Sequence, residues 1–460
     1  MENATGAPPK VAIWNNPVFR ALLYQGIVLA AFVAVVIFFF VNTFNNLKQR
    51  GISSGFGFLG NEAGFSISEV IAIPRMEGGF PIFVLTVALC IAATWGLSGA
   101  YKRRGRRLGD SMAGLSLGLA ILVGIPAVVL FITAGSFTAQ TFTEASSYRI
   151  ALITGLLNTL KVSAISCVLA TIIGLLVGIA RLSGNWLISR LALLYVETIR
   201  NIPLLLQLFF WYTAVLRSLP DVDKSLKIGG FITLNNRGVF LPGPEPRDAL
   251  PEFLAAILIA LAAGWLWRQQ ARLIQERTGR QMPVLYPALG LLVLLPGASW
   301  LLFGTPFELT YPKLEGFNFT GGFTLSPEFA AMLLGLVLYT ASFIAEIVRS
   351  GISAIPKGQR EAAGAVGLKA GQSMRLVILP QALRVIIPPL TSQYLNLTKN
   401  SSLGVAIAYP ELVSVGGTIL NQSGQAIEII AITMAVYLTI SLLISLGMNW
   451  YNARVRLIER

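Results

Sequence analysis

The chain carries few side chains that could make or break bonds. It has no histidine, and its two cysteines, Cys90 and Cys167, both lie inside apolar runs. A nucleophile–base pair or a transition-metal site depends on such groups, so we expect no catalytic residue and no metal ligand. No stretch matches the Gly-rich GxxxxGKS/T phosphate loop, which argues against ATP binding of that kind by this chain. The sequence therefore predicts a protein that is not an enzyme.

Four charged residues form two pairs within apolar surroundings. Glu197 and Arg200 are three residues apart, and so are Glu346 and Arg349. This spacing brings two side chains together on one face of a helix. Each pair either neutralises itself or offers charges to a polar substrate. We predict a structural ion pair for Glu197 and Arg200, and we count Glu346 among the candidate substrate-path residues.

Lys399 is another charged residue between two apolar segments, in the stretch TKNSSLG. An ionisable group at such a place is costly and is by default a functional hypothesis. The prolines at 388 and 389 and the glycine at 404 permit a broken helix, whose free backbone N–H groups suit a carboxylate. Two roles remain open for Lys399, the anchoring of a helix end and a place on a substrate path. The second role extends to its neighbours Asn400, Ser401 and Ser402.

The overall composition is that of a protein embedded in lipid. Of the 460 residues, 55% are apolar and only 12% are charged, about half the charged share of a soluble domain. The mean hydropathy is +0.70. A soluble core of this size needs a charged surface that this chain cannot supply. The net charge of +14 fits basic residues in cytoplasmic loops, so we expect no nucleic acid as a partner.

About ten apolar runs approach the roughly 20 residues needed to cross a bilayer. They are Ala21–Val41, Pro81–Leu97, Met112–Thr133, Ile153–Ala180, Leu187–Val215, Phe253–Trp267, Val284–Phe303, Phe329–Val348, Ala382–Leu397 and Ile429–Trp450. With the N-terminus inside, 22 of the 35 Lys and Arg residues fall in inner segments and 10 in outer ones. The positive-inside rule then predicts that both termini are cytoplasmic. The same holds for two basic hairpin tips, Lys102–Arg107 and Arg268–Arg280.

A polar, glycine-punctuated stretch belongs to the longest inner loop between two spans. It reads GQREAAGAVGLKAGQSMRLVILPQA over residues 358–382. We expect a short helix that begins near Glu361, because the macrodipole favours a carboxylate at a helix N-terminus. Gly364 and Gly367 then break or tighten the turn. The apolar run before Pro380 re-enters the membrane.

Several segments carry a resemblance to a known family, the polar amino acid permeases of ABC importers, also called histidine permease-like. They are NTLKVSAIS at 158–166, YVETIRNIPLLLQLFFWY at 195–212, YTASFIAEIVRSGISAIPKGQREAAGAVG at 339–367 and NLTKNSSLGVAIAYPEL at 396–412. Two more, GISSGFGFL at 51–59 and LNNRGVFLP at 234–242, resemble the general L-amino-acid and glutamate/aspartate branch. The resemblance covers residues 154–218 and 328–455.

The resemblance implies an all-α, polytopic protein of the bacterial inner membrane. It has a five-helix type I importer core, an N-terminal helix and two extra hairpins at 81–134 and 252–303. Its implied function is that of the permease subunit of an ATP-driven importer for polar L-amino acids, forming half of the path. The implied partners are a second homologous permease, a cytoplasmic ATP-binding subunit dimer, a periplasmic amino-acid-binding protein and membrane lipid. ATP and magnesium then belong to the ATP-binding subunit, with no cofactor on this chain. In the family the EAA loop docks onto that subunit, and the matching residues here are Glu361, Ala362, Ala363 and Gly367.

We divide the chain into four parts. Residues 1–150 hold the anchor helix and an extra hairpin, and 151–218 the first part of the core. Residues 219–327 hold periplasmic loops with the second hairpin, and 328–460 the second part of the core with the EAA loop. A secondary amino acid transporter or channel without an ATPase is the alternative. It would more often show inverted repeats or mid-span ion-coupling carboxylates, and neither is evident. The lack of histidine disfavours a membrane-embedded enzyme.

Overall fold

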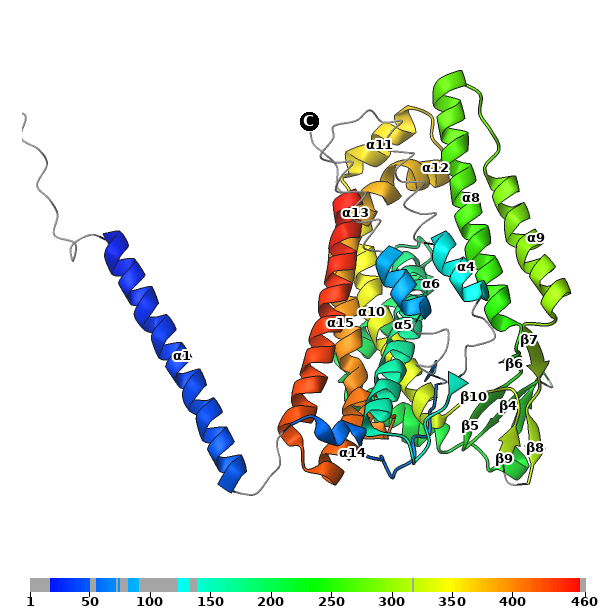
Figure 1. The fold of residues 1–460 in the computed structure, drawn as a ribbon. Helices are drawn as coiled ribbons and strands as arrows, with labels where there is room; N and C mark the ends of the chain where they lie inside the picture. The colour runs from blue at the N-terminus through cyan, green and yellow to red at the C-terminus, as the bar shows by residue number, and fades with distance from the viewer. Residues whose placement is uncertain are drawn as a thin grey trace, which may run out of the picture.

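The computed structural model describes residues 17–49, 55–71, 73–74, 82–90, 123–132, 139–229, 231–316 and 318–455. Within these residues a bundle of long helices carries short helices at one end and small β-sheets at the other (Figure 1). The predicted class of a polytopic helical protein is confirmed. The strands are an addition that the sequence analysis did not expect.

Seven helical segments in the described residues are long and apolar enough to cross a membrane. They are Phe19–Thr43 within α1 (Pro17–Gln49), α5 (Tyr148–Arg181), α8 (Leu250–Thr278), α9 (Leu285–Phe303), α10 (Pro327–Ser353), the stretch Ala370–Ile407, and Ala426–Asn452 within α15 (Ala426–Val455). A bent helix pair supplies an eighth. Eight of the ten predicted spans are thus found. The other two, 81–97 and 112–133, lie partly outside the described residues. The structure describes there only the helical residues 82–90 and 123–132, which include α4 (Ile125–Ile132).

The predicted span from Leu187 to Val215 is a bent pair of helices and not one continuous helix. The chain forms α6 (Trp186–Asn201), then α7 (Leu204–Phe209) and the π-helical η5 (Phe210–Leu216), with a bend of 105° between the two parts. Ile202 adopts an extended conformation, with φ −97° and ψ 127°. The ring of the following Pro203 disfavours helical geometry in the residue before it, which explains the break.

The core of the bundle lies around α10, the most buried of the described spans. Its most extensive partner is α5. The two backbones approach closely because α5 presents glycines to α10. A Cβ atom at Gly174 would lie 2.6 Å from Ile344 Cβ, and one at Gly178 would lie 2.8 Å from the Ala345 carbonyl oxygen. Larger side chains at these positions would push the two helices apart.

The chain after α10 runs through a series of short and long helical elements. They are α11 (Lys357–Ala365), α12 (Ala370–Ser373), the π-helical η7 (Met374–Ile378), α13 (Leu379–Asn400), the 3₁₀-helical η8 (Ser401–Ile407) and α14 (Leu412–Ser423). The prolines at 388 and 389 lie inside α13 without ending it. The helix changes character only after Asn400, and Ala408 then turns the chain with a left-handed φ of 59°.

The sequence predicted loops around a helical hairpin for residues 219–327, but the structure also has β-strands there. They are β3 (Leu226–Ile228), β4 (Ile232–Asn235), β5 (Gly238–Leu241), β6 (Gly243–Pro246), β7 (Phe307–Thr310), β8 (Lys313–Glu315), β9 (Asn318–Thr320) and β10 (Phe323–Leu325), after the short η6 (Val222–Lys224). A four-stranded antiparallel sheet has the order β10-β5-β4-β3, and β6 pairs with β7 and β8 with β9. Strands from before and after the α8–α9 hairpin therefore meet in the same sheet.

The α8–α9 hairpin is confirmed. Besides α9, the main partner of α8 is α4, and Figure 1 places the hairpin at the edge of the bundle. Apolar residues of α9 remain open to the surroundings, with Leu301 88% and Tyr286 78% exposed. Such a face suits lipid rather than water.

The 55–71 segment, which includes η2 (Gly57–Gly60), packs on the bundle at the end where the strands lie. Its apolar residues Phe58, Ala63 and Ile67 are buried in one cluster with residues of α5, α14 and α15. Just after this segment, the short strand β1 (Ile73–Pro74) pairs with β2 (Ala139–Gln140), which precedes α5. This segment holds the ends of three helices together.

Candidate functional site

The predicted EAA loop forms an exposed helix at the end of the bundle opposite the strands (Figure 1). α11 follows α10 after only three residues. It is held on the bundle by the buried Ala363 and by the Gln381 side-chain amide, which donates to Gln359 Oε1 at 3.3 Å. The rest of α11 faces outward and is open to a partner.

The outward side of α11 combines a charge with small and apolar side chains. Glu361 and Ala362 are exposed, and Val366, just after the helix, is 76% exposed. The end of α15 and the α8–α9 connection lie at the same end of the bundle (Figure 1). An exposed apolar side chain at such a place is typical of a protein contact surface.

Two details of this loop differ from the prediction. Glu361 lies in the middle of α11, which begins at Lys357, so its carboxylate is not at the helix N-terminus. The helix starts earlier because Pro356 and the residues after it already adopt capping and helical geometry. Ala363 points into the bundle and is 4% exposed. Among the two predicted small contacts, only Ala362 is therefore presented to the outside.

Gly367 adopts a left-handed conformation with φ of +82° just after α11. Its N–H donates to the Gly364 carbonyl at 2.9 Å and tightens the turn, as predicted. A Cβ atom placed on Gly367 would meet no atom within 4 Å. A substitution there is disfavoured by backbone strain and not by a steric clash with the described residues.

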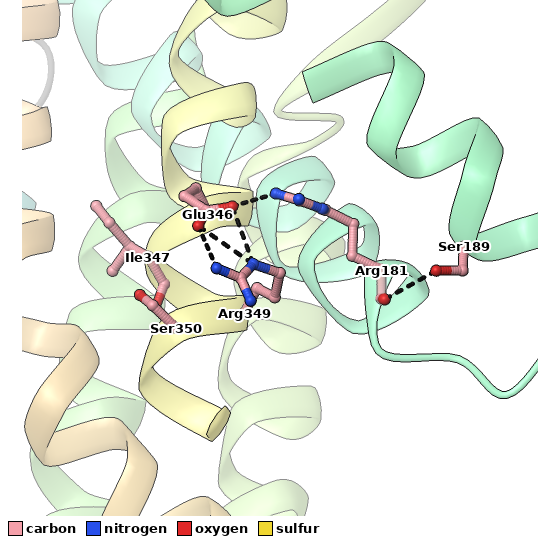
Figure 2. A network of polar contacts seen from close by, with 6 residues as sticks. All are labelled: Arg181, Ser189, Glu346, Ile347, Arg349 and Ser350. Atoms are coloured by element: carbon pink, nitrogen blue, oxygen red, sulfur yellow. Dashed lines mark hydrogen bonds and ion pairs between the residues drawn. The ribbon is translucent and has the colours of Figure 1, made fainter. Parts of the chain in front are cut away.

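Glu346 lies in an ion-pair network on the bundle side of the EAA loop (Figure 2). Arg349 Nε donates to both carboxylate oxygens of Glu346, at 3.1 and 3.2 Å, and Arg349 Nη2 donates at 2.5 Å. Arg181, the last residue of α5, pairs with the same carboxylate from the other side. Ser189 Oγ on α6 donates to the Arg181 carbonyl at 3.1 Å. The network thus joins α5, α6 and α10.

The predicted ion pair between Glu197 and Arg200 does not form in the structure, which describes both residues. The Arg200 guanidinium lies instead over the Phe343 ring, 4.9 Å from its centroid. A guanidinium over an aromatic face is a favourable cation–π arrangement. The Glu197 carbonyl, by contrast, accepts a hydrogen bond from Asn201 Nδ2 at 2.7 Å. Both residues lie on α6 at a spacing of three, but their side chains do not pair with each other.

Lys399 lies in the last turn of α13 and is exposed. Within the described residues no carboxylate forms an ion pair with it. Its neighbours turn their hydroxyls back to the helix: Ser401 Oγ donates to the Thr398 carbonyl and Ser402 Oγ to the Lys399 carbonyl, both at 2.7 Å. Asn400 is half-buried. The ammonium of Lys399 is therefore the most available polar group of this stretch.

Glu411 is a buried acidic residue that sequence reasoning missed. Its carboxylate caps α14 by accepting the N–H groups of Val413 at 2.9 Å and Ser414 at 2.7 Å, and it accepts the Tyr437 hydroxyl at 3.1 Å. The N–H groups at the start of α14 are therefore satisfied by this chain's own carboxylate. The signal was a single Glu inside the apolar stretch AYPELVSVG.

A second missed feature is Lys161, on the apolar helix α5. Its Nζ lies 2.9 Å from Glu69 Oε2 and 4.3 Å from the centroid of the Phe329 ring. One turn earlier, Asn158 Nδ2 donates to the carbonyls of Glu69 and Pro410, both at 2.9 Å. These contacts fix the 55–71 segment onto α5 and leave the Lys161 charge neutralised.

Comparison with known proteins finds relatives that match nearly the whole chain. The family described as "Binding-protein-dependent transport system inner membrane component" matches residues 170–457. A putative amino-acid ABC transporter permease protein, YhdX of Escherichia coli (strain K12), is 41% identical over 447 residues, which cover 97% of this chain and 96% of YhdX. The general L-amino acid transport system permease protein AapQ of Rhizobium johnstonii is 41% identical over a stretch that covers 97% of this chain and 94% of AapQ. The glutamate/glutamine/aspartate/asparagine transport system permease protein BztB of Rhodobacter capsulatus is 40% identical over a stretch that covers 87% of this chain and 98% of BztB.

Proposed function

The chain belongs to the binding-protein-dependent transport system inner membrane components, within the amino-acid ABC permeases of the general L-amino-acid branch, and from this we propose its role in transport. It is the permease subunit of an ATP-driven importer for polar L-amino acids and forms half of the translocation path. It has no catalytic activity of its own. ATP and magnesium are bound by a separate ATP-binding subunit, which hydrolyses the nucleotide.

The outward side of α11 carries this proposal. It presents Glu361, Ala362 and Val366 beyond the helix bundle, with nothing in the described chain covering them. We assign this face to the groove of the ATP-binding subunit. Glu361 offers a charge-assisted hydrogen bond, and Ala362 lets the groove close tightly. Gly367 allows the turn that leads back to the membrane.

The remaining partners follow from the orientation. With α11 in the cytoplasm of a bacterial cell, the N- and C-termini are cytoplasmic and the strands of 219–327 face the periplasm. A periplasmic amino-acid-binding protein docks at that end, and a second homologous permease completes the path. Lys399 and the adjacent residues 400–402 are the part of this chain that we place on the path. The ammonium of Lys399 supports this: it is exposed and forms no ion pair among the described residues, and charged groups inside a membrane usually face water or a polar partner.

Purification and reconstitution test the proposal. The chain, expressed with its candidate partners, should copurify with an ATP-binding subunit, and proteoliposomes should take up a polar L-amino acid only with ATP and binding protein. A hydrolysis-deficient ATP-binding subunit is the matched control and should abolish uptake while leaving the complex intact. Uptake by the chain alone, driven by an ion gradient, would establish the secondary-transporter alternative instead.

A further inference from the structure

We propose that Arg181 and Glu346 are positioning residues that lock α5 to α10, so that both helices move as one body when α11 is displaced. This inference rests on the proposed function, in which the ATP-binding subunit moves α11. It concerns how that movement reaches the membrane part. It assigns no substrate contact to Glu346, in contrast to the interpretation from the sequence.

The first support is the contact face between the two helices. Gly174, Gly178 and Arg181 follow each other at four and three residues, so they share one face of α5. The two glycines bring that face within close contact of Ile344, Ala345 and Val348 on α10. Arg181 ends the same row with an ion pair to Glu346 (Figure 2). The close-packed face is therefore closed by a charged contact at its last position.

The second support is the distribution of charge. One carboxylate, Glu346, meets two guanidinium groups, and only Arg181 reaches it from another helix. The Arg181 side chain is 11% exposed and that of Glu346 is 25% exposed, so water screens this contact less than a surface ion pair. Loss of Arg181 would leave the Glu346–Arg349 pair intact within α10 and remove only the ion pair between the two helices, while their packed faces stay in contact.

The third support is the path from α11 into the membrane. α10 ends at Ser353 and α11 begins at Lys357, so the short connection passes a displacement of α11 directly to α10. Arg181 transfers it to the end of α5. Its carbonyl, held by Ser189, transfers it further to α6 (Figure 2). Three membrane helices, α5, α6 and α10, would thus follow the movement of α11.

The test uses the assembled complex in proteoliposomes, with uptake and ATP hydrolysis measured on the same sample. Arg181→Gln should keep hydrolysis and lower the amount of amino acid transported per ATP about tenfold, a fold-change usual for coupling between sites. Arg190→Gln is the matched control, since Arg190 is exposed on α6 and forms no ion pair among the described residues. Arg181→Lys should restore part of the ratio.

The Glu346 side of the pair gives a second, independent arm. The double variant Arg181→Gln with Glu346→Gln should transport no less per ATP than Arg181→Gln alone, because partners in one contact are non-additive. Because Glu346 also pairs with Arg349, the single variant Glu346→Gln is measured beside the double variant. Arg181→Lys, which keeps the charge, carries the test if Arg181→Gln assembles poorly.

Three results would overturn the inference. They are an unchanged ratio of amino acid transported per ATP in Arg181→Gln, additive losses of this ratio in the double variant, or a loss of transport that a smaller amount of assembled complex or a lower unfolding temperature explains entirely. The failure of the proposed function looks different. In that case the wild-type chain itself would not bind an ATP-binding subunit, and the inference would fall with it.

Discussion

Replacing Glu411 by alanine should destabilise the corner between η8 and α14 by about 2–5 kcal/mol. The side chain is fully buried, so water cannot replace the lost acceptor. Loss of the cap on the N–H groups of Val413 and Ser414 costs about 0.5–2 kcal/mol. Burial raises the pKa of Glu411 to about 7. Above that pH the Tyr437 hydroxyl donates to a charged acceptor, and loss of this hydrogen bond costs about 1.5–3 kcal/mol. Glu411→Gln keeps one acceptor oxygen, so its effect should be about half as large.

The assay is thermal stability of the purified chain in detergent, followed as the fraction that stays monodisperse after heating. Glu276→Ala is the matched control, because Glu276 is exposed on α8 and forms no ion pair in the described part of the chain. The midpoint should fall clearly for Glu411→Ala, by less for Glu411→Gln and hardly at all for the control. Equal midpoints for Glu411→Ala and Glu276→Ala would show that the buried carboxylate does not hold this corner.

Four further predictions concern the transport cycle and the topology. Glu361→Ala should weaken binding of the ATP-binding subunit by about 1.5–3 kcal/mol if the carboxylate is buried in the groove, which a pull-down detects. Gly367→Asp should lower amino-acid-stimulated hydrolysis through backbone strain. Wild-type hydrolysis and uptake in both variants would contradict the docking assignment. Lys399→Met should impair uptake in a normally assembled complex, and unchanged uptake kinetics would remove this residue from the path. A cysteine at Gly105 should react with an impermeant reagent only from the cytoplasm, since positive-inside charge places that tip there; labelling from the periplasm would reverse the topology. Deletion of 81–134 should reduce assembly more than selectivity, and a normally assembled complex with altered substrate preference would show the opposite.

The long apolar helices could be predicted from the sequence because their signal is local. A run of about 20 apolar residues has one stable arrangement in lipid, and eight of the ten predicted runs are found as helices. The bend at Pro203 could also have been anticipated, since the effect of proline on the preceding residue is local. The strands of 219–327 left a weaker signal. ITLN and GVFL show alternating burial on either side of the two-residue turn Asn236–Arg237, a pattern typical of a β-hairpin.

The polar contacts of the candidate site could be predicted only in part. The Glu346–Arg349 pair follows from helical spacing, and it forms. The same spacing failed for Glu197 and Arg200, because Phe343 on another helix offers Arg200 an alternative. Arg181 is 165 residues away from Glu346, so no local pattern indicates their contact. Partner choice between helices is decided by the packing of the whole bundle, which one sequence does not display.

The attachment of the 55–71 segment sets an order for the biosynthesis of this protein. The segment is made early, yet its partners are made late: Glu69 waits for Lys161, and the Gly55 N–H donates to Glu428, 373 residues further along the chain, at 2.8 Å. α1 and the residues after it can enter the membrane as soon as they leave the ribosome. The segment reaches its final contacts only when α15, the last helix of the described residues, has been inserted. A chain shortened before α15 would thus lack Ile429 in the cluster that buries Phe58 and Ile67, and the acceptor of the Gly55 N–H.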